Sequence, residues 1–217
     1  MAIELDHLMW GAPSLEEGMA EAERLFGVAA AQGGVHPGLG TKNALLSLGG
    51  RAYLEIIAPD PAQDLGGTFG ERLAGLSDCG LITWAAASPN LSALAERAAG
   101  LEVTARGPVP TERRMPDGDL LKWELLFLGG HAHPGLVPFF IDWMETPHPA
   151  TTNPLAGRFR SLEIGSPDAE GLNALFSGLG MNMTATPAET PGLTARIDTD
   201  QGEVRLTKAP GTDGWAL

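Results

Sequence analysis

A histidine and a glutamate lie within two hydrophobic segments near the start of the chain. His7 lies in the partly alternating segment 3–10 and Glu55 in the apolar run Tyr53–Ile57, and both segments read as strands. A carboxylate in such a run needs a polar cavity or a partner, because burying an unpaired charge is costly. Imidazole nitrogen and carboxylate oxygen both suit a divalent Zn, Fe, Mn or Ni ion. The alternative for His7 is a strand-end histidine whose ring bonds a backbone carbonyl.

Two further polar residues lie between His7 and Glu55. His36 lies in the glycine-bearing loop Val35–Thr41, where backbone can approach a ligand closely. A histidine there can act as a general base near neutral pH, or it can simply face solvent. Asn43 begins the next strand and offers an amide to an oxygen-rich ligand, or else it makes local bonds at a strand edge.

An arginine and two tryptophans extend the set of predicted ligand-binding residues. Arg114 precedes the turn Pro116–Gly118, where a guanidinium can clamp a carboxylate, although a solvated hairpin tip explains it equally. Trp123 follows on the next strand, and Trp84 lies on an apolar strand over 80–87. If both face one cavity they form an apolar wall, and ordinary core packing is the alternative.

The elements that must position these residues recur along the chain. A strand, a helix that begins at a proline and a short polar residue, and two or more further strands follow one another three times. The strands that begin the three copies cover 3–10, 80–87 and 161–165. Each unit is too small to bury both sheet faces alone, so the units should pack together. We expect a paired domain over 1–147, a linker near Pro147–Pro154, and a third, shorter module over 158–217.

The composition limits the partners. Acidic residues outnumber basic ones by 27 to 14, the net charge is −13, and no basic cluster exceeds Arg113–Arg114. Nucleic acid and anionic membrane surfaces are therefore not expected partners. The chain has no secretion signal and no apolar stretch of membrane-spanning length, so we expect a soluble cytoplasmic protein. The single Cys79 excludes an internal disulfide.

Several fragments, in this order, resemble one family. They are Leu5-Asp6-His7-Leu8, Val35–Leu45, Tyr53–Pro61, Arg114–Gly118 and Leu121–Trp123. The set is similar to the vicinal oxygen chelate superfamily, which includes glyoxalase I, extradiol dioxygenases and bleomycin-resistance proteins, and within it to the glyoxalase-like domain branch. The resemblance covers roughly residues 3–147. It implies an α+β fold of tandem βαβββ modules whose mixed sheets curl around a cavity.

The resemblance also implies a metal site with ligands from the first and last strands of each unit. His7 and Glu55 occupy these positions in the first unit. In the second unit the corresponding positions fall near Trp84 and on Ile141, and Asp142 is one residue out of register, which puts it on the opposite face unless a bulge intervenes. The ligand set is thus incomplete, so the chain either borrows ligands or has lost the metal.

Two functions follow from this resemblance. The first is a glyoxalase-like lyase, isomerase or dioxygenase for a small oxygen-rich molecule. In it His7 and Glu55 hold a metal or polarise the substrate, His36 and Glu55 are the catalytic residues with His36 as proton carrier, and the substrate contacts His7, Asn43, Trp84, Arg114 and Trp123. The second is a binding or sequestering protein without chemistry. A homodimer is left open, because relatives often pair units across subunits.

Overall fold

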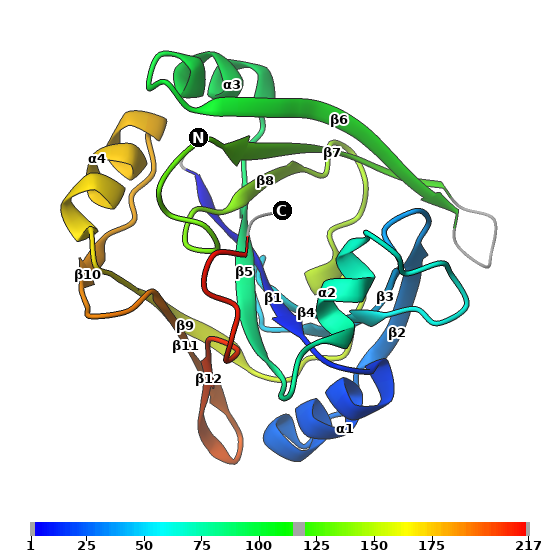
Figure 1. Cartoon of the computed structure of the whole chain (residues 1–217). Coiled ribbons are helices and arrows are strands. Elements are labelled where there is room, and N and C mark those ends of the chain that lie inside the picture. Colours follow the sequence, from blue (N-terminus) through cyan, green and yellow to red (C-terminus); the bar gives the residue numbers. More distant parts are fainter. Residues whose placement is uncertain (1–2, 115–119, 216–217) are drawn as a thin grey trace.

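The computed structural model describes residues 3–114 and 120–215, with the backbone alone at Arg113 and Arg114. Eight strands form one mixed sheet in the order β2-β3-β4-β1-β5-β8-β7-β6. The sheet curls between β2 and β3 at one side and β6 and β7 at the other (Figure 1). Its strands are β1 Glu4–Gly11, β2 Ala31–His36, β3 Thr41–Ser47, β4 Tyr53–Pro59, β5 Gly80–Ala87, β6 Thr104–Arg114, β7 Leu120–Gly129 and β8 Phe139–Asp142.

The sheet consists of two equivalent halves. In the first half β1 pairs in parallel with β4, with His7 beside Tyr53. In the second half β5 pairs in parallel with β8, with Ala85 beside Phe139. The antiparallel pair of β1 and β5 joins the halves. The predicted α+β fold of tandem modules curled around a cavity is therefore confirmed.

The helices begin and end where local chemistry favours it. Helix α1 (Leu15–Phe26) begins after Ser14, whose hydroxyl accepts a bond from the Glu17 amide, and ends at Gly27 in the left-handed conformation. Helices α3 (Leu91–Ala99) and α4 (Ala169–Leu179) begin after Asn90 and Asp168 in the same way. The short helix α2 (Phe69–Ala74) and the 3-10 turn η1 (Pro149–Thr151) lie in connections. None of the described helices is long and apolar enough to span a membrane.

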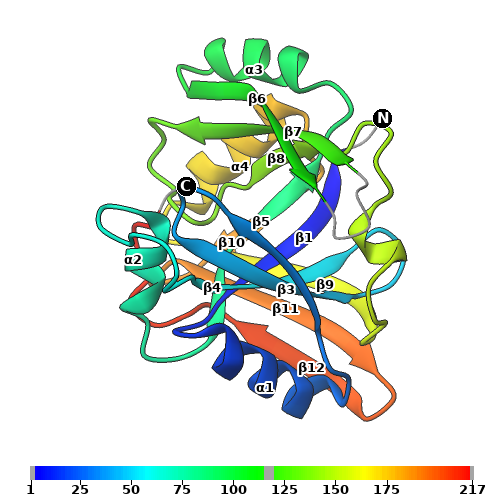
Figure 2. The same cartoon turned by 90° about the vertical axis from the view of Figure 1, so that its right-hand side faces the viewer.

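A second, four-stranded sheet follows. Its strands are β9 Arg158–Ser166, β10 Ala185–Pro187, β11 Gly192–Thr199 and β12 Gly202–Thr207, in the order β10-β9-β11-β12. It lies beside α1 in Figure 2, opposite α3. Its apolar face, with Ile164, Ala195 and Ile197, joins the same buried cluster as the large sheet. The division into 1–147 and 158–217 stays a prediction.

The two faces of the large sheet have different surroundings. Leu8 and Trp84 lie on the outer face, in the cluster that α1, α3, α4 and the small sheet cover. Met9, Tyr53 and Ala85 lie on the inner face, in a separate cluster that includes Leu73 of α2. This alternation follows from the two-residue period of a strand. The position of a residue along its strand thus decides whether its side chain reaches the inner face.

The Trp84 indole is central to the outer cluster. It is buried, packs edge-on against Phe176 of α4, and donates a hydrogen bond from Nε1 to the Leu136 carbonyl at 2.9 Å. We expect Trp84→Ala to lower the free energy of unfolding by about 3–5 kcal/mol, because it leaves a large cavity. Urea unfolding followed by circular dichroism measures this. Trp123→Ala, at a half-buried position on the inner face, is the control and should cost clearly less; equal costs would contradict the assignment of Trp84 to the core.

Candidate functional site

The inner face of the large sheet encloses a cavity of about 270 Å³. Both halves of the sheet and the loops beside it line this cavity. Five of the residues singled out in the sequence lie together in its wall, namely His7, His36, Asn43, Glu55 and Trp123. The polar members of these five come from β1 to β4, and the opposite wall is mostly aromatic and aliphatic, with Thr111 and Glu112 of β6 as polar exceptions. The described lining residues are His7, Met9, Val35, His36, Pro37, Leu39, Asn43, Leu45, Tyr53, Glu55, Ile57, Phe69, Thr111, Glu112, Leu121, Trp123, Leu125, Phe127, Phe139, Ile141, Trp143 and Pro149.

A bulge in β1 brings two consecutive side chains together. The pairing of β1 with β5 shifts register between Leu5 and His7, so Asp6 is the extra residue. Without the shift, neighbouring side chains would point to opposite faces. With it, the carboxylate of Asp6 lies 2.8 Å from Nδ1 of His7, and both groups are buried.

Asp6 is the centre of a buried hydrogen-bond network. Nε2 of His148 lies 3.0 Å from its Oδ2, and the Trp143 indole Nε1 donates to both oxygens at 3.2 and 3.3 Å. Burial alone would raise the pKa of the Asp6 carboxyl, but the hydrogen bonds with His148 and His7 outweigh it and lower the pKa to about 2. Asp6 is therefore an ionised acceptor held by three side chains.

The network fixes the proton of His7. Because the ionised Asp6 only accepts, Nδ1 of His7 carries a hydrogen and donates it to the carboxylate, while Nε2 faces the cavity. That Nε2 is buried, has no hydrogen-bond partner among the described residues, and lies 3.5 Å from Oε2 of Glu55. The ring is held between Tyr53, stacked at 4.5 Å, and Phe139, edge-on at 5.3 Å.

Glu55 is oriented by an amide whose own direction is fixed. Oδ1 of Asn43 accepts the Gly34 amide at 2.7 Å, so its Nδ2 faces Glu55 and donates to Oε1 at 2.6 Å. A second bulge, between Gln32 and Val35, makes room for this amide. A Cβ at Gly33 would lie 2.1 Å from Oδ1 of Asn43, so only glycine fits there.

His36 completes the polar wall. Its Nδ1 bonds the Thr41 hydroxyl at 2.8 Å, and its Nε2 lies 4.0 Å from Oε1 of Glu55. The side chain is 24 % exposed, whereas those of His7 and Glu55 are 3 % and 9 % exposed. Glu55 thus lies between a buried histidine and one that reaches solvent.

Aromatic rings form the opposite wall. Phe127 of β7 stacks on Phe139 of β8 at 5.6 Å, and Trp123 lies 5.3 Å from Trp143. Phe69 of α2 closes one side of the cavity. The cavity therefore has one acid–base side and one apolar side.

The expected place of Trp84 in this wall is wrong. Trp84 pairs with Leu8, so it lies on the outer face, and Ala85 lies opposite His7. The expected match of Trp84 with His7 was off by one residue, because β5 is buried along nearly its whole length and shows no alternation from which to read its register. Trp123 lines the cavity without Trp84. Arg114 was predicted to bind the substrate, but its side chain lies outside the part of the chain that the structure describes, so this role stays a prediction.

The second half of the sheet provides no chelating pair. Ala85 and Ile141 occupy the positions that His7 and Glu55 occupy in the first half, since Ala85 pairs with Phe139 as His7 does with Tyr53. The Asp142 carboxylate instead accepts the Met144 amide at 2.8 Å. Among the described residues, no three His, Cys, Asp or Glu side chains are grouped to hold a metal. The residues present do not fit a ligand set drawn from both units.

Asp6, Tyr53, Trp143 and His148 belong to the site but were not predicted. Asp6 precedes His7 directly, and strand alternation assigns it to the other face. Trp143 and His148 come from a segment more than a hundred residues away in sequence, whose approach depends on tertiary packing. The Asp-His dipeptide at a strand that begins a unit is the one signal that the sequence offered.

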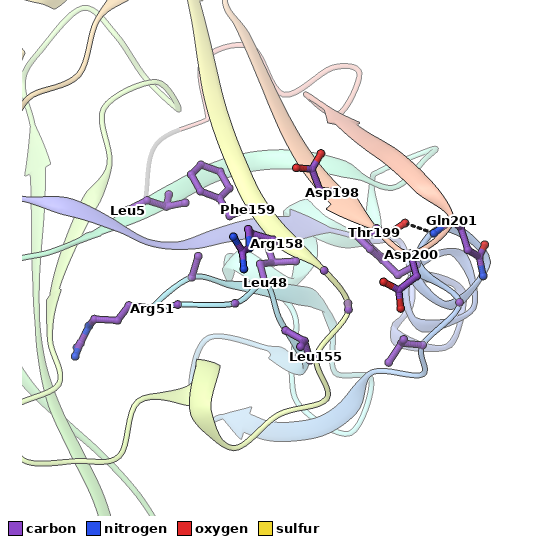
Figure 3. Close-up of a pocket in the computed structure, with 18 of the residues that line it drawn as sticks. Leu5, Leu48, Arg51, Leu155, Arg158, Phe159, Asp198, Thr199, Asp200 and Gln201 are labelled. Atoms are coloured by element: carbon purple, nitrogen blue, oxygen red, sulfur yellow. Dashed lines mark hydrogen bonds between the residues drawn. The ribbon is translucent and has the colours of Figure 1, made fainter.

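A larger hollow of about 840 Å³ lies between the first unit and the small sheet (Figure 3). Leu5 and Leu48 line it from the large sheet side, and Arg158, Phe159 and Asp198 line it from β9 and β11. Its described lining contains no histidine or cysteine. Asp198 is paired with Arg160 at 3.3 Å. Of these two hollows, the smaller one alone has histidines among its described lining residues.

Comparisons with known proteins agree with this architecture. The family described as "Glyoxalase-like domain" matches residues 5–180. A hypothetical protein from Staphylococcus aureus has a similar structure, with a TM-score of 0.66 and 15 % identity over 96 % of this chain and 86 % of that one. A hypothetical protein from Bacillus halodurans C-125 gives a TM-score of 0.52 and 15 % identity over 68 % of this chain and 99 % of that one.

An enzyme has a similar fold as well. A methylmalonyl-CoA epimerase variant from Streptomyces coelicolor, in complex with 2-nitronate-propionyl-CoA, gives a TM-score of 0.50 and 18 % identity over 69 % of this chain and all of that one. At such identities the likeness is one of fold. A search of curated proteins found no match.

The Asp6 network makes stability depend on pH. The folded pKa of about 2 lies below the ordinary value of 3.8, so the contribution is complete above pH 4 and is lost as the pH falls toward 2. We expect the stability difference between the wild type and Asp6→Asn to shrink by on the order of 2 kcal/mol over this range. Urea unfolding at several pH values measures it. Asp200→Asn, at an exposed turn, controls for the loss of one carboxylate; a constant difference for Asp6→Asn would contradict the network.

Proposed function

Because the chain belongs to the glyoxalase-like domain family, we propose that it is an enzyme that moves a proton beside a carbonyl group of a small organic molecule. The reaction is an isomerisation or a lyase step. One observation carries the proposal: Nε2 of His7, which is buried and has no hydrogen-bond partner among the described residues, lies 3.5 Å from Oε2 of Glu55 in the wall of a largely apolar cavity. Two buried acceptors facing each other form a site for one proton.

The His7–Glu55 pair acts as the general base. When His7 carries its hydrogen on Nδ1 alone, its Nε2 and the ionised Oε2 of Glu55 are two acceptors 3.5 Å apart. A proton taken from the substrate carbon is held between Nε2 and Oε2 and removes the repulsion between them. As the imidazolium forms, it lies between the carboxylates of Asp6 and Glu55, and both stabilise it.

The electrons of the broken C–H bond move onto the carbonyl oxygen, and an enolate forms. In an isomerisation of an α-hydroxy carbonyl compound, the hydroxyl proton moves to the former carbonyl oxygen and the pair returns its proton to the former carbonyl carbon. The carbonyl group thus changes places with the hydroxyl group, and no oxidant or co-reactant is consumed. In a lyase step the proton goes to a departing oxygen instead. His36, close to Glu55 and partly exposed, carries protons between the site and solvent.

The proposal predicts that one carboxylate is essential and another is not. We expect Glu55→Gln to slow solvent deuterium exchange into the methyl group of 1-phenyl-1,2-propanedione, followed by NMR, by about 10²- to 10⁴-fold. The amide keeps the size of the side chain and removes the carboxylate of the pair, so that no second acceptor remains beside Nε2 of His7 and one of the two carboxylates that stabilise the imidazolium is lost.

The matched control is Glu189→Gln, which changes an exposed carboxylate outside the cavity. It should leave the exchange rate within about twofold of the wild type, because Glu189 does not line the cavity. Exchange that survives Glu55→Gln, or that Glu189→Gln reduces equally, would refute the assignment of the base.

The donor set gives a prediction about metal content. Two of the four positions that the superfamily uses hold Ala85 and Ile141, which have no donor atoms. We therefore expect the exchange rate to be unchanged after dialysis against EDTA, and metal below one equivalent by inductively coupled plasma mass spectrometry. Near-stoichiometric metal that is lost in the His7→Ala/Glu55→Ala double variant would instead establish a two-residue chelate.

A binding protein without chemistry is the second candidate. The apolar residues at Ala85 and Ile141 and the aromatic wall favour it, since they supply contact area but no reacting group. Tight binding of a small ketone with no exchange above the buffer rate would support this alternative over the enzyme.

A further inference from the structure

The residues that line the cavity restrict which molecules can bind in it. We infer that the substrate is an uncharged, mostly apolar carbonyl compound with a flat ring or short branched body, bound with its carbonyl at the His7–Glu55 side. The position of the carbonyl rests on the proposed function. The inferred size, neutral charge and apolar character of the substrate are argued from the cavity alone.

The volume sets the size. A cavity of about 270 Å³ lies just below the usual range for drug-sized ligands. At about 30 Å³ per water-sized unit it holds roughly ten non-hydrogen atoms. A single ring with a short side chain has this size, and a nucleotide-bearing thioester is much larger.

The charges in the wall exclude an anion. Its described lining residues include Glu55 and Glu112 but neither lysine nor arginine. The ionised Asp6 lies directly behind His7. A carboxylate or phosphate placed against these groups would lose part of its water, face the negative groups and meet no lysine or arginine among the described lining residues, which is unfavourable.

Two arginines near the cavity are already placed on aromatic rings. The guanidinium of Arg72 lies over Trp215 at 4.6 Å and over Phe69 at 5.6 Å. That of Arg106 lies 4.5 Å from the ring centre of Phe127. The rings of Phe69 and Phe127 belong to the cavity wall, and the guanidinium groups are not among the lining residues. These cations stabilise the wall and do not provide an anion site within it.

The apolar wall favours a flat body. Phe127 and Phe139 stack with an interplanar angle of 21°, and Trp123 and Trp143 lie beside them. Aromatic side chains bind a flat ring by offset stacking or edge contacts. Polar groups lie only on the β1–β4 side of the described wall, apart from Thr111 and Glu112 at β6. A ligand with a single polar group, facing the β1–β4 side, therefore matches this wall.

A pair of probes tests the inference. 1-Phenyl-1,2-propanedione and phenylglyoxylate have the same number of non-hydrogen atoms and differ in a methyl group against a charged oxygen. We expect isothermal titration calorimetry to show the neutral dione binding roughly tenfold or more tightly than the anion. Trp123→Ala should weaken the dione by a similar factor, whereas Trp84→Phe, on the outer face, should leave it unchanged.

The opposite results are equally definite. Phenylglyoxylate binding as tightly as the dione would overturn the inference, and loss of that binding in Arg114→Ala would identify the carboxylate clamp responsible. Failure of the dione to bind up to its solubility limit would also overturn it. Because binding is measured without turnover, a neutral preference without deuterium exchange would leave this inference standing and reject the proposed function. Deuterium exchange together with tighter binding of the anion would support the proposed function and overturn this inference about the substrate.

Discussion

The hydrogen bond between Asp6 and His7 is the interaction on which the site depends. It exists because a bulge in β1 places two successive side chains on one face of the sheet. Asp6 then accepts a hydrogen from Nδ1 of His7 and orients the ring so that Nε2 faces Glu55. Trp143 and His148, from a distant part of the chain, bond to Asp6. The His7 ring is therefore held both by the local bulge in β1 and by tertiary contacts to Asp6.

Much of the fold was readable from the sequence because its signals are local. The caps at Ser14, Asn90 and Asp168 and the apolar strands fixed the repeated order of elements. Strand β2 was missed, since its Ala-Gln-Gly-Gly start has turn composition, and it is a strand because it pairs with β3. The short helix α2 was missed because one turn and a half carries little periodic signal.

The site was predictable only in part, for a similar reason. His7, Asn43 and Glu55 were recognised as polar residues in apolar strands, and they do share a cavity with His36. Asp6 was not found, because its direction is set by the pairing of β1 with β5, more than seventy residues away. Trp84 was misplaced by one residue, since a strand buried on both faces carries no alternation from which to read register.

The unequal halves of the sheet have a stereochemical consequence. His7 and Glu55 lie on one wall, and their counterparts Ala85 and Ile141 bear only hydrocarbon. A flat molecule held against the aromatic side thus presents only one of its two faces to His7 and Glu55. Two halves with the same fold but different side chains therefore make a wall that is chiral toward a prochiral ligand.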